Sequence, residues 1–296
     1  MSSSSLIVNK NPEMSLTETA LDFLAPKNPV TQERQFRIIP EWWMHTMATI
    51  SYYGATHKLS NKHCKYETDS QGRPLCFKQL IRETGMKIAQ KSDRPDLPYA
   101  FRAVASKVEN AWCMSGGKIA FYEGLIRALE SEYRDFGVGT FTLEEKVAAV
   151  LGHEIAHAAA SHGPRGYELG LVVGFILSSA ADLLVALFGD EEGDVHWVID
   201  TILSRLHFLS YALITTSRSR PHEFEADKYG MVYLQRAGYN PAVAIWLQEF
   251  FASDEPKTGV KVMDWAMSFF ISYPYSQERA KANRETLKLI QAGILR

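Results

Sequence analysis

The sequence predicts an α+β fold that is predominantly α-helical and carries a small sheet. Three observations lead to this prediction. Apolar residues recur at helical spacing in several segments, short aromatic and β-branched runs flank a Ser-Gly-Gly turn at 115–117, and the stretch LGHEIAHAAASHG at 151–163 lies within one helical pattern. With 296 residues, 46% of them hydrophobic, the chain can bury a full core in one large domain or two small ones.

The composition excludes one class of partner and predicts a location. A formal net charge of -2 and a pI near 6.5 give no basic excess, so we expect no nucleic-acid partner. The cysteines Cys64, Cys76 and Cys113 are too few for a disulfide framework, and we expect reduced thiols. The N-terminus lacks the positive start and the apolar run of a signal peptide, which predicts a cytoplasmic chain.

The first part of the chain is predicted to be an arm followed by helices. Ser, Asn and Pro punctuate residues 1–40, which we expect to form a flexible arm with a short helix near Leu16 to Leu24. Residues 41–296 are expected to form one domain. Within it, a helix rich in aromatic residues begins at Glu41, and another covers Leu75 to Lys91.

Strands and a long helix follow. The segment around the Ser-Gly-Gly turn predicts two or three strands, of which Lys118 to Tyr122 is the clearest. Thr142 precedes a helical apolar repeat, and Glu145 lies three residues on, which is the pattern of a capping box. We therefore expect a helix of about five turns that ends near Gly163. Further helices are predicted at 169–189, 195–216, 220–238, after Asn240-Pro241, at 262–271 and at 277–295.

The stretch at 151–163 has the spacing of a metal site. His153 and His157 are four residues apart, so they project from the same face of a helix and can hold one zinc ion. Glu154 can reach a water on that metal and move its proton, which is the H-E-x-x-H mechanism of metallopeptidases. The alternative is a chance pair of histidines on an Ala-rich helix. A buried helix favours the metal, because buried polar groups need partners.

A third zinc ligand must come from elsewhere in the chain. A histidine at 163 would complete a metzincin site, but that residue is Gly163, and His162 has poor helical geometry for the same ion, so we interpret it as a cap or a supporting group. A later helix offers Glu223 and Asp227, which are four apart and share a face. We expect Glu223 to be the ligand and Asp227 to orient a ligand histidine. The alternative is a solvated acidic helix face.

Three blocks of sequence resemble one family. NAWCMSGGKIAFYEGLI (110–126), LGHEIAHAAASHG (151–163) and SRPHEFEAD (219–227) are similar to motifs of the zinc endopeptidases that include HtpX, the CAAX prenyl proteases, the BepA-type proteases and the mitochondrial Oma-type protease. The resemblance spans about 75–290 and implies a zincin-like metallopeptidase domain of the H-E-x-x-H gluzincin type. It implies one zinc ion per chain and a protein or peptide substrate.

The resemblance also implies roles for individual residues. Zinc would be held by His153, His157 and Glu223, with Glu154 as the base and Asp227 behind a ligand. In this family the edge strand before the zinc helix adds the substrate as a further strand. That role would fall to Ile119, Ala120, Phe121 and Tyr122.

The sequence departs from the family near its C-terminus. The family commonly has a His-Pro pair before a helix, whereas this chain reads ISYPYSQERA, with Tyr273 at the position of the histidine. A phenol can donate a hydrogen bond to an oxyanion, so we expect Tyr273 to polarise the scissile carbonyl. It cannot serve as a ligand gate in the way the family's histidine does.

The apolar segment at 169–189 is long enough to approach the span of a bilayer. Asp182 lies inside it, and a single span would separate the expected ligands on opposite sides of a membrane. We therefore expect 169–214 to pack on the domain or to lie on a membrane surface.

The sequence thus predicts a zinc-dependent endopeptidase that cleaves extended or misfolded protein segments, a function in protein quality control. Two alternatives stay open. One is an inactive or latent zinc-binding protein with a chaperone-like or regulatory role, which the tyrosine at 273 keeps open. The other is a membrane-embedded protease of the CAAX prenyl protease type.

Overall fold

The computed structural model describes residues 16–35, 37, 39–56, 67–68, 72, 74–163, 220–253 and 276–296. Its helices are α1 (Leu16–Leu24), α2 (Glu41–Thr56), α3 (Phe77–Ala89), α4 (Glu123–Ser131), α5 (Leu143–Ala159), α8 (Arg220–Arg236), α9 (Val243–Ser253) and α11 (Ser276–Gln291). Its strands are β1 (Glu67–Thr68), β2 (Pro74–Leu75), β3 (Ala100–Val104), β4 (Ala111–Met114) and β5 (Lys118–Tyr122). The α+β class, predominantly α with a small sheet, is confirmed.

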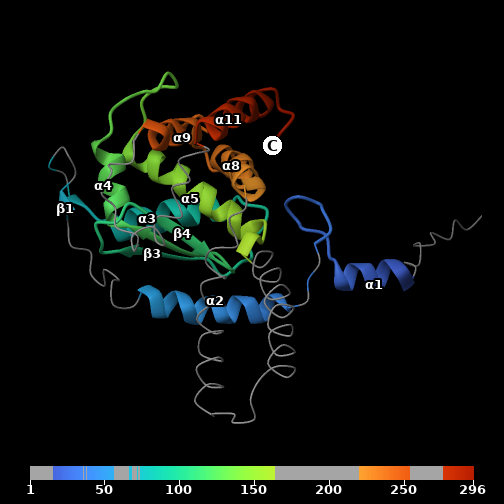
Figure 1. Ribbon diagram of the computed structural model, residues 1–296. Helices are drawn as coiled ribbons and strands as arrows, with labels where there is room; N and C mark the ends of the chain where they lie inside the picture. Colours follow the sequence, from blue (N-terminus) through green and yellow to red (C-terminus); the bar gives the residue numbers. More distant parts are fainter. Residues whose placement is uncertain are drawn as a thin grey trace, which may run out of the picture.

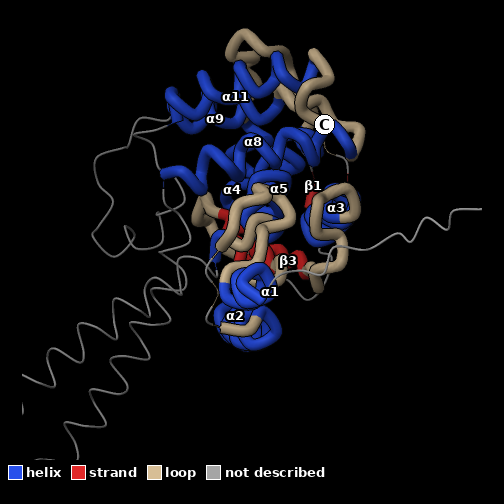
Figure 2. The backbone as a smooth tube through the Cα atoms, turned by 90° about the vertical axis from the view of Figure 1, so that its right-hand side faces the viewer, coloured by secondary structure: helices blue, strands red, loops and turns tan. Residues whose placement is uncertain are grey.

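The helices lie on both sides of a three-stranded sheet. Helix α2 covers one face, α3 and α5 lie on the other, and α8, α9 and α11 are stacked beyond α5 (Figure 1). Viewed from the side, α2 and α11 lie at opposite ends of the molecule (Figure 2). The main core lies between the sheet and these helices, and it includes Ile81, Val147 and Leu151.

The side chains of β5 alternate between the two faces of the sheet. Ile119 and Phe121 belong to the main core, whereas Ala120 and Tyr122 pack in a smaller cluster with Tyr52 of α2. The hydroxyl of Tyr52 donates a hydrogen bond to the backbone oxygen of Ile119 at 2.9 Å, which fixes α2 on this face.

The order of the strands corrects one expectation. Strand β5 pairs with β3 in parallel and with β4 in antiparallel orientation, so it is the central strand of the order β3-β5-β4. The prediction that Ile119 to Tyr122 form an edge strand is therefore wrong. All five residues of β5 are buried, and buried backbone groups need partners on both sides. In the described part of the chain, the edges of this sheet are β3 and β4.

Helix α5 begins as predicted. The Thr142 hydroxyl accepts a hydrogen bond from the Glu145 backbone N–H, and the Glu145 carboxylate accepts one from the Thr142 N–H at 2.9 Å. The helix ends at Ala159, earlier than the expected end near Gly163. Ser161 has a φ of 56°, a left-handed conformation that a continuing helix does not allow.

Helix α8 crosses α5 closely because two glycines meet at the crossing. A Cβ on Gly230 would lie 3.0 Å from the carbonyl carbon of Gly152 and 3.1 Å from the nitrogen of His153. Any larger residue at 230 would therefore hold the helices apart. The close approach occurs beside His153. It therefore sets the distance between α8 and the face of α5 that carries the His153 side chain.

The later helices agree with the sequence where they are described. Helix α8 is followed by Gly238 with a φ of 81°, as expected for a C-terminal cap. The Asn240 side chain accepts a hydrogen bond from the Ala242 N–H at 3.0 Å before α9 begins. The segments predicted at 169–189, 195–216 and 262–271 lie outside the described residues, as does Tyr273.

The arm is partly anchored. Helix α1 covers the residues expected, but the following loop is not loose at Asn28, which is 2% exposed. Its side-chain amide donates a hydrogen bond to the backbone oxygen of Ala160 at 2.8 Å, just beyond the end of α5. Asn28 therefore holds the loop against the domain, because the buried amide and the carbonyl satisfy each other. The flexibility of the arm as a whole stays a prediction.

Two further findings concern the cysteines and membranes. Cys76 is disulfide-bonded and Cys113 is a free thiol, so the expectation of reduced thiols is wrong for Cys76. Among the described helices, none combines the length and the apolar character needed to cross a bilayer.

Candidate metal centre

Three buried side chains from α5 and α8 converge on one point. The Nε2 atoms of His153 and His157 lie 3.0 Å apart. The Glu223 carboxylate faces both, with Oε2 3.4 Å from the Nε2 of His153 and Oε1 3.3 Å from the Nε2 of His157. The three ligand atoms lie within 4.8 Å of one another, so one metal ion could reach all of them.

Local helix geometry explains the convergence. The two histidines are one turn apart on α5 and share a face, as the sequence predicted. Glu223 lies in the first turn of α8, and the crossing at Gly230, farther along the same helix, holds α5 and α8 together. The ligand set thus depends on one helix for two positions and on a helix crossing for the third.

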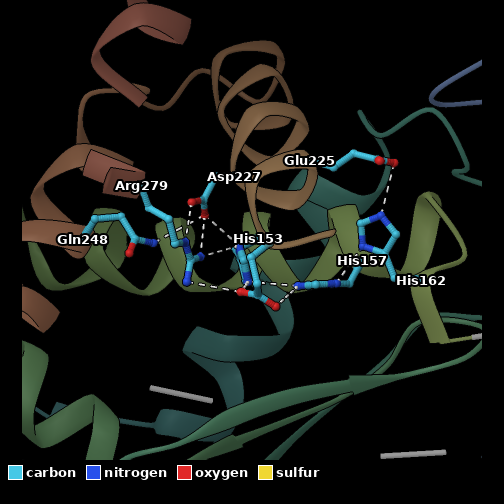
Figure 3. A network of polar contacts seen from close by, with 8 residues as sticks. His153, His157, His162, Glu225, Asp227, Gln248 and Arg279 are labelled. Atoms are coloured by element: carbon cyan, nitrogen blue, oxygen red, sulfur yellow. Dashed lines mark hydrogen bonds and ion pairs between the residues drawn. The ribbon is translucent and has the colours of Figure 1, made fainter. Parts of the chain in front are cut away.

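Asp227 and Arg279 form the side of the centre behind His153 (Figure 3). The Nδ1 of His153 lies 2.9 Å from Oδ1 of Asp227. Arg279, from α11, donates to both Asp227 oxygens at 2.7 and 2.8 Å, and its Nη1 lies 3.2 Å from Oε2 of Glu223. Burial is the largest single influence on both carboxyls and opposes their ionisation, but the Arg279 charge and the contacts that each carboxyl makes with the ligand histidines together outweigh it and lower the pKa of Glu223 and of Asp227.

The surroundings of His153 favour a positive charge. Burial is the largest single influence and lowers the pKa of its imidazole, but the hydrogen bonds to Asp227 and Glu223 and the charges of these carboxylates together outweigh burial and raise that pKa to about 9. A site that stabilises an imidazolium by this much also suits a cation held between the same groups.

His157 has its own group behind it. The Nδ1 of His162 lies 2.8 Å from the Nδ1 of His157, and the Nε2 of His162 lies 3.1 Å from Oε1 of Glu225 (Figure 3). His162 is fully buried, and burial lowers the pKa of its imidazole to about 3. His162 therefore contacts a candidate ligand and is not placed as a ligand itself.

Glu154 lies beside the candidate ligands at the wall of a small cavity. It is 3% exposed and lines a cavity of about 40 Å³ together with His153, Gln248 and Arg279. The apolar part of the wall consists of Ala111, Leu125, Val150, Leu247 and Phe251. A carboxylate in this position can exchange a proton with a water or an amine that enters the cavity.

The centre fits a divalent cation of the zinc type. Glu154, Glu223 and Asp227 are buried carboxylates, and among the described residues Arg279 is the one buried guanidinium that meets them. With His153 neutral, as a metal ligand must be, three negative charges and one positive charge leave two unbalanced, which a divalent ion would neutralise. The Oε1 of Glu223 is buried and accepts no hydrogen bond. Two imidazoles and a carboxylate are also donors that zinc prefers.

The sequence profile of peptidase family M48 matches residues 77–287, which is more than half of the chain and includes both helices of the centre. The chain belongs to peptidase family M48. Membership confirms the family that the three sequence blocks resembled, and it confirms the zincin-like α+β class.

Several M48 relatives are similar along much of the chain. The mitochondrial metalloendopeptidase OMA1 of Schizosaccharomyces pombe is 24% identical over 260 residues, which cover 88% of this chain and 65% of the relative. The metalloprotease LoiP of Escherichia coli is 26% identical over 77% of this chain and 79% of its own length. The β-barrel assembly-enhancing protease of the same species is 23% identical over 55% and 30%. The chain thus spans about two thirds of the first relative and under a third of the last.

These M48 relatives are named as metalloproteases or proteases, so the family comprises metal-dependent hydrolases that act on protein substrates.

The sequence did not predict the positions of Arg279 and Gln248 near the centre, nor the contact between Glu225 and His162. Gln248 donates to Asp227 at 3.4 Å. Arg279 follows the tyrosine-proline pair by a few residues, and this nearness to a motif was the signal available for it.

Proposed function

We propose that this M48 chain is a zinc-dependent endopeptidase that cleaves extended or misfolded protein segments in protein quality control. One observation carries the proposal: His153, His157 and Glu223 converge in a buried centre, and Glu154 lies beside them at the wall of a cavity. The names of the relatives agree with it, since one is a metalloendopeptidase and another a protease that enhances β-barrel assembly.

The roles of the residues follow from their positions. Zinc, when bound by His153, His157 and Glu223, would supply Lewis-acid chemistry that polarises a carbonyl and makes a nearby water more acidic. Glu154 would take a proton from the attacking water and deliver it to the leaving amine. Asp227 would keep His153 oriented through the contact at its Nδ1.

Strand β4 replaces β5 as the proposed site of substrate addition. A strand that already has two neighbours cannot accept a third, which excludes β5. Strand β4 has one described neighbour, and Asn110 and Ala111 line the same cavity as His153 and Glu154. An extended peptide on the outer edge of β4 would therefore pass the centre, with main-chain hydrogen bonds as its principal anchor.

Tyr273 keeps its proposed role as an oxyanion donor. The tyrosine-proline pair precedes α11 by only a few residues, and α11 carries Arg279 into the centre. Replacement of Tyr273 by Phe should lower kcat more than it changes KM, because a donor to an oxyanion acts mainly in the transition state. Equal kcat values for the wild type and Tyr273→Phe would contradict the role of Tyr273 as an oxyanion donor.

The location of the chain stays a prediction. The N-terminal composition predicts the cytoplasm, where thiols are kept reduced, whereas Cys76 is disulfide-bonded. Thiol trapping in intact cells distinguishes the two locations: in the cytoplasm Cys76 would be a free thiol, and in an oxidising compartment it would be blocked by the disulfide.

Membrane contact through 169–214, including the CAAX prenyl protease alternative, is tested by flotation of the chain with lipid vesicles.

A paired assay tests the function. The wild-type chain should contain one zinc per chain and cleave an unfolded protein, and Glu154→Gln should keep the zinc and lose the cleavage. Stoichiometric zinc without cleavage of any unfolded substrate would favour the latent, chaperone-like alternative. A folded chain that binds no zinc would contradict both.

A further inference from the structure

Each candidate ligand histidine has a second ring nitrogen that points away from the other ligands. For His153 this is Nδ1, which meets Asp227. For His157 it is also Nδ1, which meets the Nδ1 of His162 at 2.8 Å. His162 in turn reaches Glu225 at 3.1 Å. The two ligands are therefore supported differently, one by a carboxylate directly and the other through a second imidazole.

The positions of the hydrogens follow from the metal site. A neutral histidine that binds zinc through Nε2 carries its proton on Nδ1. His157 must then donate to the Nδ1 of His162, which has to be an acceptor. A neutral His162 with an accepting Nδ1 carries its proton on Nε2, from which it donates to Glu225. Each hydrogen bond thus has one donor and one acceptor, and the chain ends on a carboxylate.

The fold fixes His162 in this position. The turn at Ser161, with its φ of 56°, ends the helical path before His162. The ring of His222 stacks on the ring of His162 with centroids 4.4 Å apart and planes inclined by 8°. Asn28 holds the preceding backbone at Ala160. His162 is 0% exposed, so water does not compete for its nitrogens.

We propose that His162 and Glu225 are positioning residues that hold the His157 imidazole in the orientation and tautomer that binds the metal. The inference rests on the proposed function. Supporting partners of this kind change metal affinity by about 10- to 100-fold when they are removed. His162 therefore contributes to the centre without touching the metal, and Glu225 contributes through His162.

The dissociation constant for zinc, measured by competition with a chelator, tests the proposal. His162→Phe removes the acceptor and keeps a flat ring, and it should weaken zinc binding by about 10- to 100-fold. His162→Gln offers a carbonyl oxygen to His157 and should bind zinc more tightly than His162→Phe. His222→Phe is the matched comparison, because it keeps a stacked ring and leaves both hydrogen bonds of His162 intact, and its zinc affinity should stay closer to that of the wild type than the affinity of His162→Phe does.

Other outcomes would overturn the proposal. Wild-type zinc affinity in folded His162→Phe would do so, as would equal weakening in the Phe and Gln variants, which would indicate packing alone. If His162→Phe does not fold, Glu225→Ala and Glu225→Gln replace it: the first should weaken zinc binding, and the second, which retains an acceptor oxygen, should weaken it less. Equal affinities in these two variants would count against the role of Glu225.

Nitrogen-15 NMR of the zinc-loaded chain gives a second readout that a purely structural role would not produce. His162 should be protonated at Nε2 and unprotonated at Nδ1, and the opposite tautomer would overturn the proposal. Both measurements are independent of cleavage. A wild-type chain that binds zinc but cleaves nothing would contradict the proposed function and leave this inference intact.

Discussion

Arg279 decides whether the negative charges of the centre can be buried. It is 5% exposed and contacts both Asp227 and Glu223, which lie on a different helix. A guanidinium can reach two carboxylates at once because its donors are arranged in a fixed plane. The residue thus joins α11 to the metal centre, and its removal would leave two buried carboxylates without their strongest partner.

The first prediction concerns this residue. Arg279→Met should lower the free energy of unfolding by about 3 to 5 kcal/mol, because it breaks a buried ion pair on one side. Arg284→Met is the matched control on the same helix. Arg284 pairs with Glu249 at 2.8 Å near the surface, where loss of a pair costs about 0 to 1 kcal/mol. Urea unfolding of both variants measures the difference, and equal losses would contradict the account.

Sequence reasoning found some residues of the centre because their signal is local. His153, Glu154 and His157 lie on one helix, so their spacing alone predicts a shared face. Arg279 could not be found in this way. The helix that carries it is an ordinary amphipathic pattern, and which of its charged residues turns inward depends on packing against α8 and α9.

At the scale of elements, the crossing of α5 and α8 sets the distance between the ligands. Gly152 and Gly230 meet there, and neither was singled out in the sequence. A glycine within a helix is unfavourable by about 0.5 to 1 kcal/mol relative to alanine, so its presence in both helices needs a reason. The close backbone approach supplies it.

The second prediction tests this crossing. Gly230→Ala should destabilise the chain and weaken zinc binding, because overpacking costs about 1 to 3 kcal/mol and exceeds the gain in helix propensity. Gly54→Ala in α2 is the control, since a Cβ there meets nothing within 4 Å. In thermal unfolding, the melting temperature of Gly54→Ala should equal or exceed that of the wild type. A Gly230→Ala variant that gains stability as Gly54→Ala does would contradict the account.

A third prediction concerns how α2 is fixed at its first residue. Glu41 contacts His45 at 3.5 Å, Arg94 at 3.0 Å and Arg37 at 3.3 Å. The His45 hydrogen bond is the largest influence on its carboxyl. Burial opposes ionisation, but the arginines add to the effect of His45, and the pKa falls to about 2. Since the folded pKa lies below the unfolded value, this stabilisation is present above pH 4.5 and is lost as the pH falls toward 2.

Melting temperatures of the wild type and Glu41→Gln at neutral and acid pH test this sign. The difference in melting temperature between the wild type and Glu41→Gln should be largest near pH 7 and smaller near pH 3. A gap that is constant, or that grows in acid, would show that the Glu41 charge does not stabilise α2.

The pairing of strands could not be read from the sequence. The run KIAFY predicts a strand correctly, but periodicity does not state how many neighbours a strand has. All five residues are buried, including Lys118, whose amine donates to the backbone oxygen of Pro98. The edge position was expected only from the family resemblance, and the pairing of β5 on both sides explains why the structure differs.

For the whole molecule, the metal centre joins parts of the chain that are distant in sequence. Its residues come from α5, α8, α9 and α11, and the arm closes the end of α5 through Asn28. The fold class and the family could be predicted because three sequence blocks carry them. The anchoring of the arm could not, since a single buried amide leaves no periodic pattern.

A fourth prediction follows for the stability of the whole chain. An ion that binds only the folded state stabilises it by about 2.7 kcal/mol when its free concentration is 100 times its dissociation constant. Zinc should therefore raise the melting temperature of the wild type, and a chelator should reverse the rise. In Glu223→Gln the effect should largely disappear. An equal shift in both proteins would indicate zinc bound at another site.

A crystal structure of the zinc-loaded chain, with anomalous data collected at the zinc edge, tests most directly whether His153, His157 and Glu223 hold the ion. We expect one strong anomalous peak, bound by the Nε2 atoms of His153 and His157 and by the Glu223 carboxylate at about 2.0 to 2.2 Å. A peak held by other residues, or no peak among these three in a zinc-loaded crystal, would contradict this ligand set.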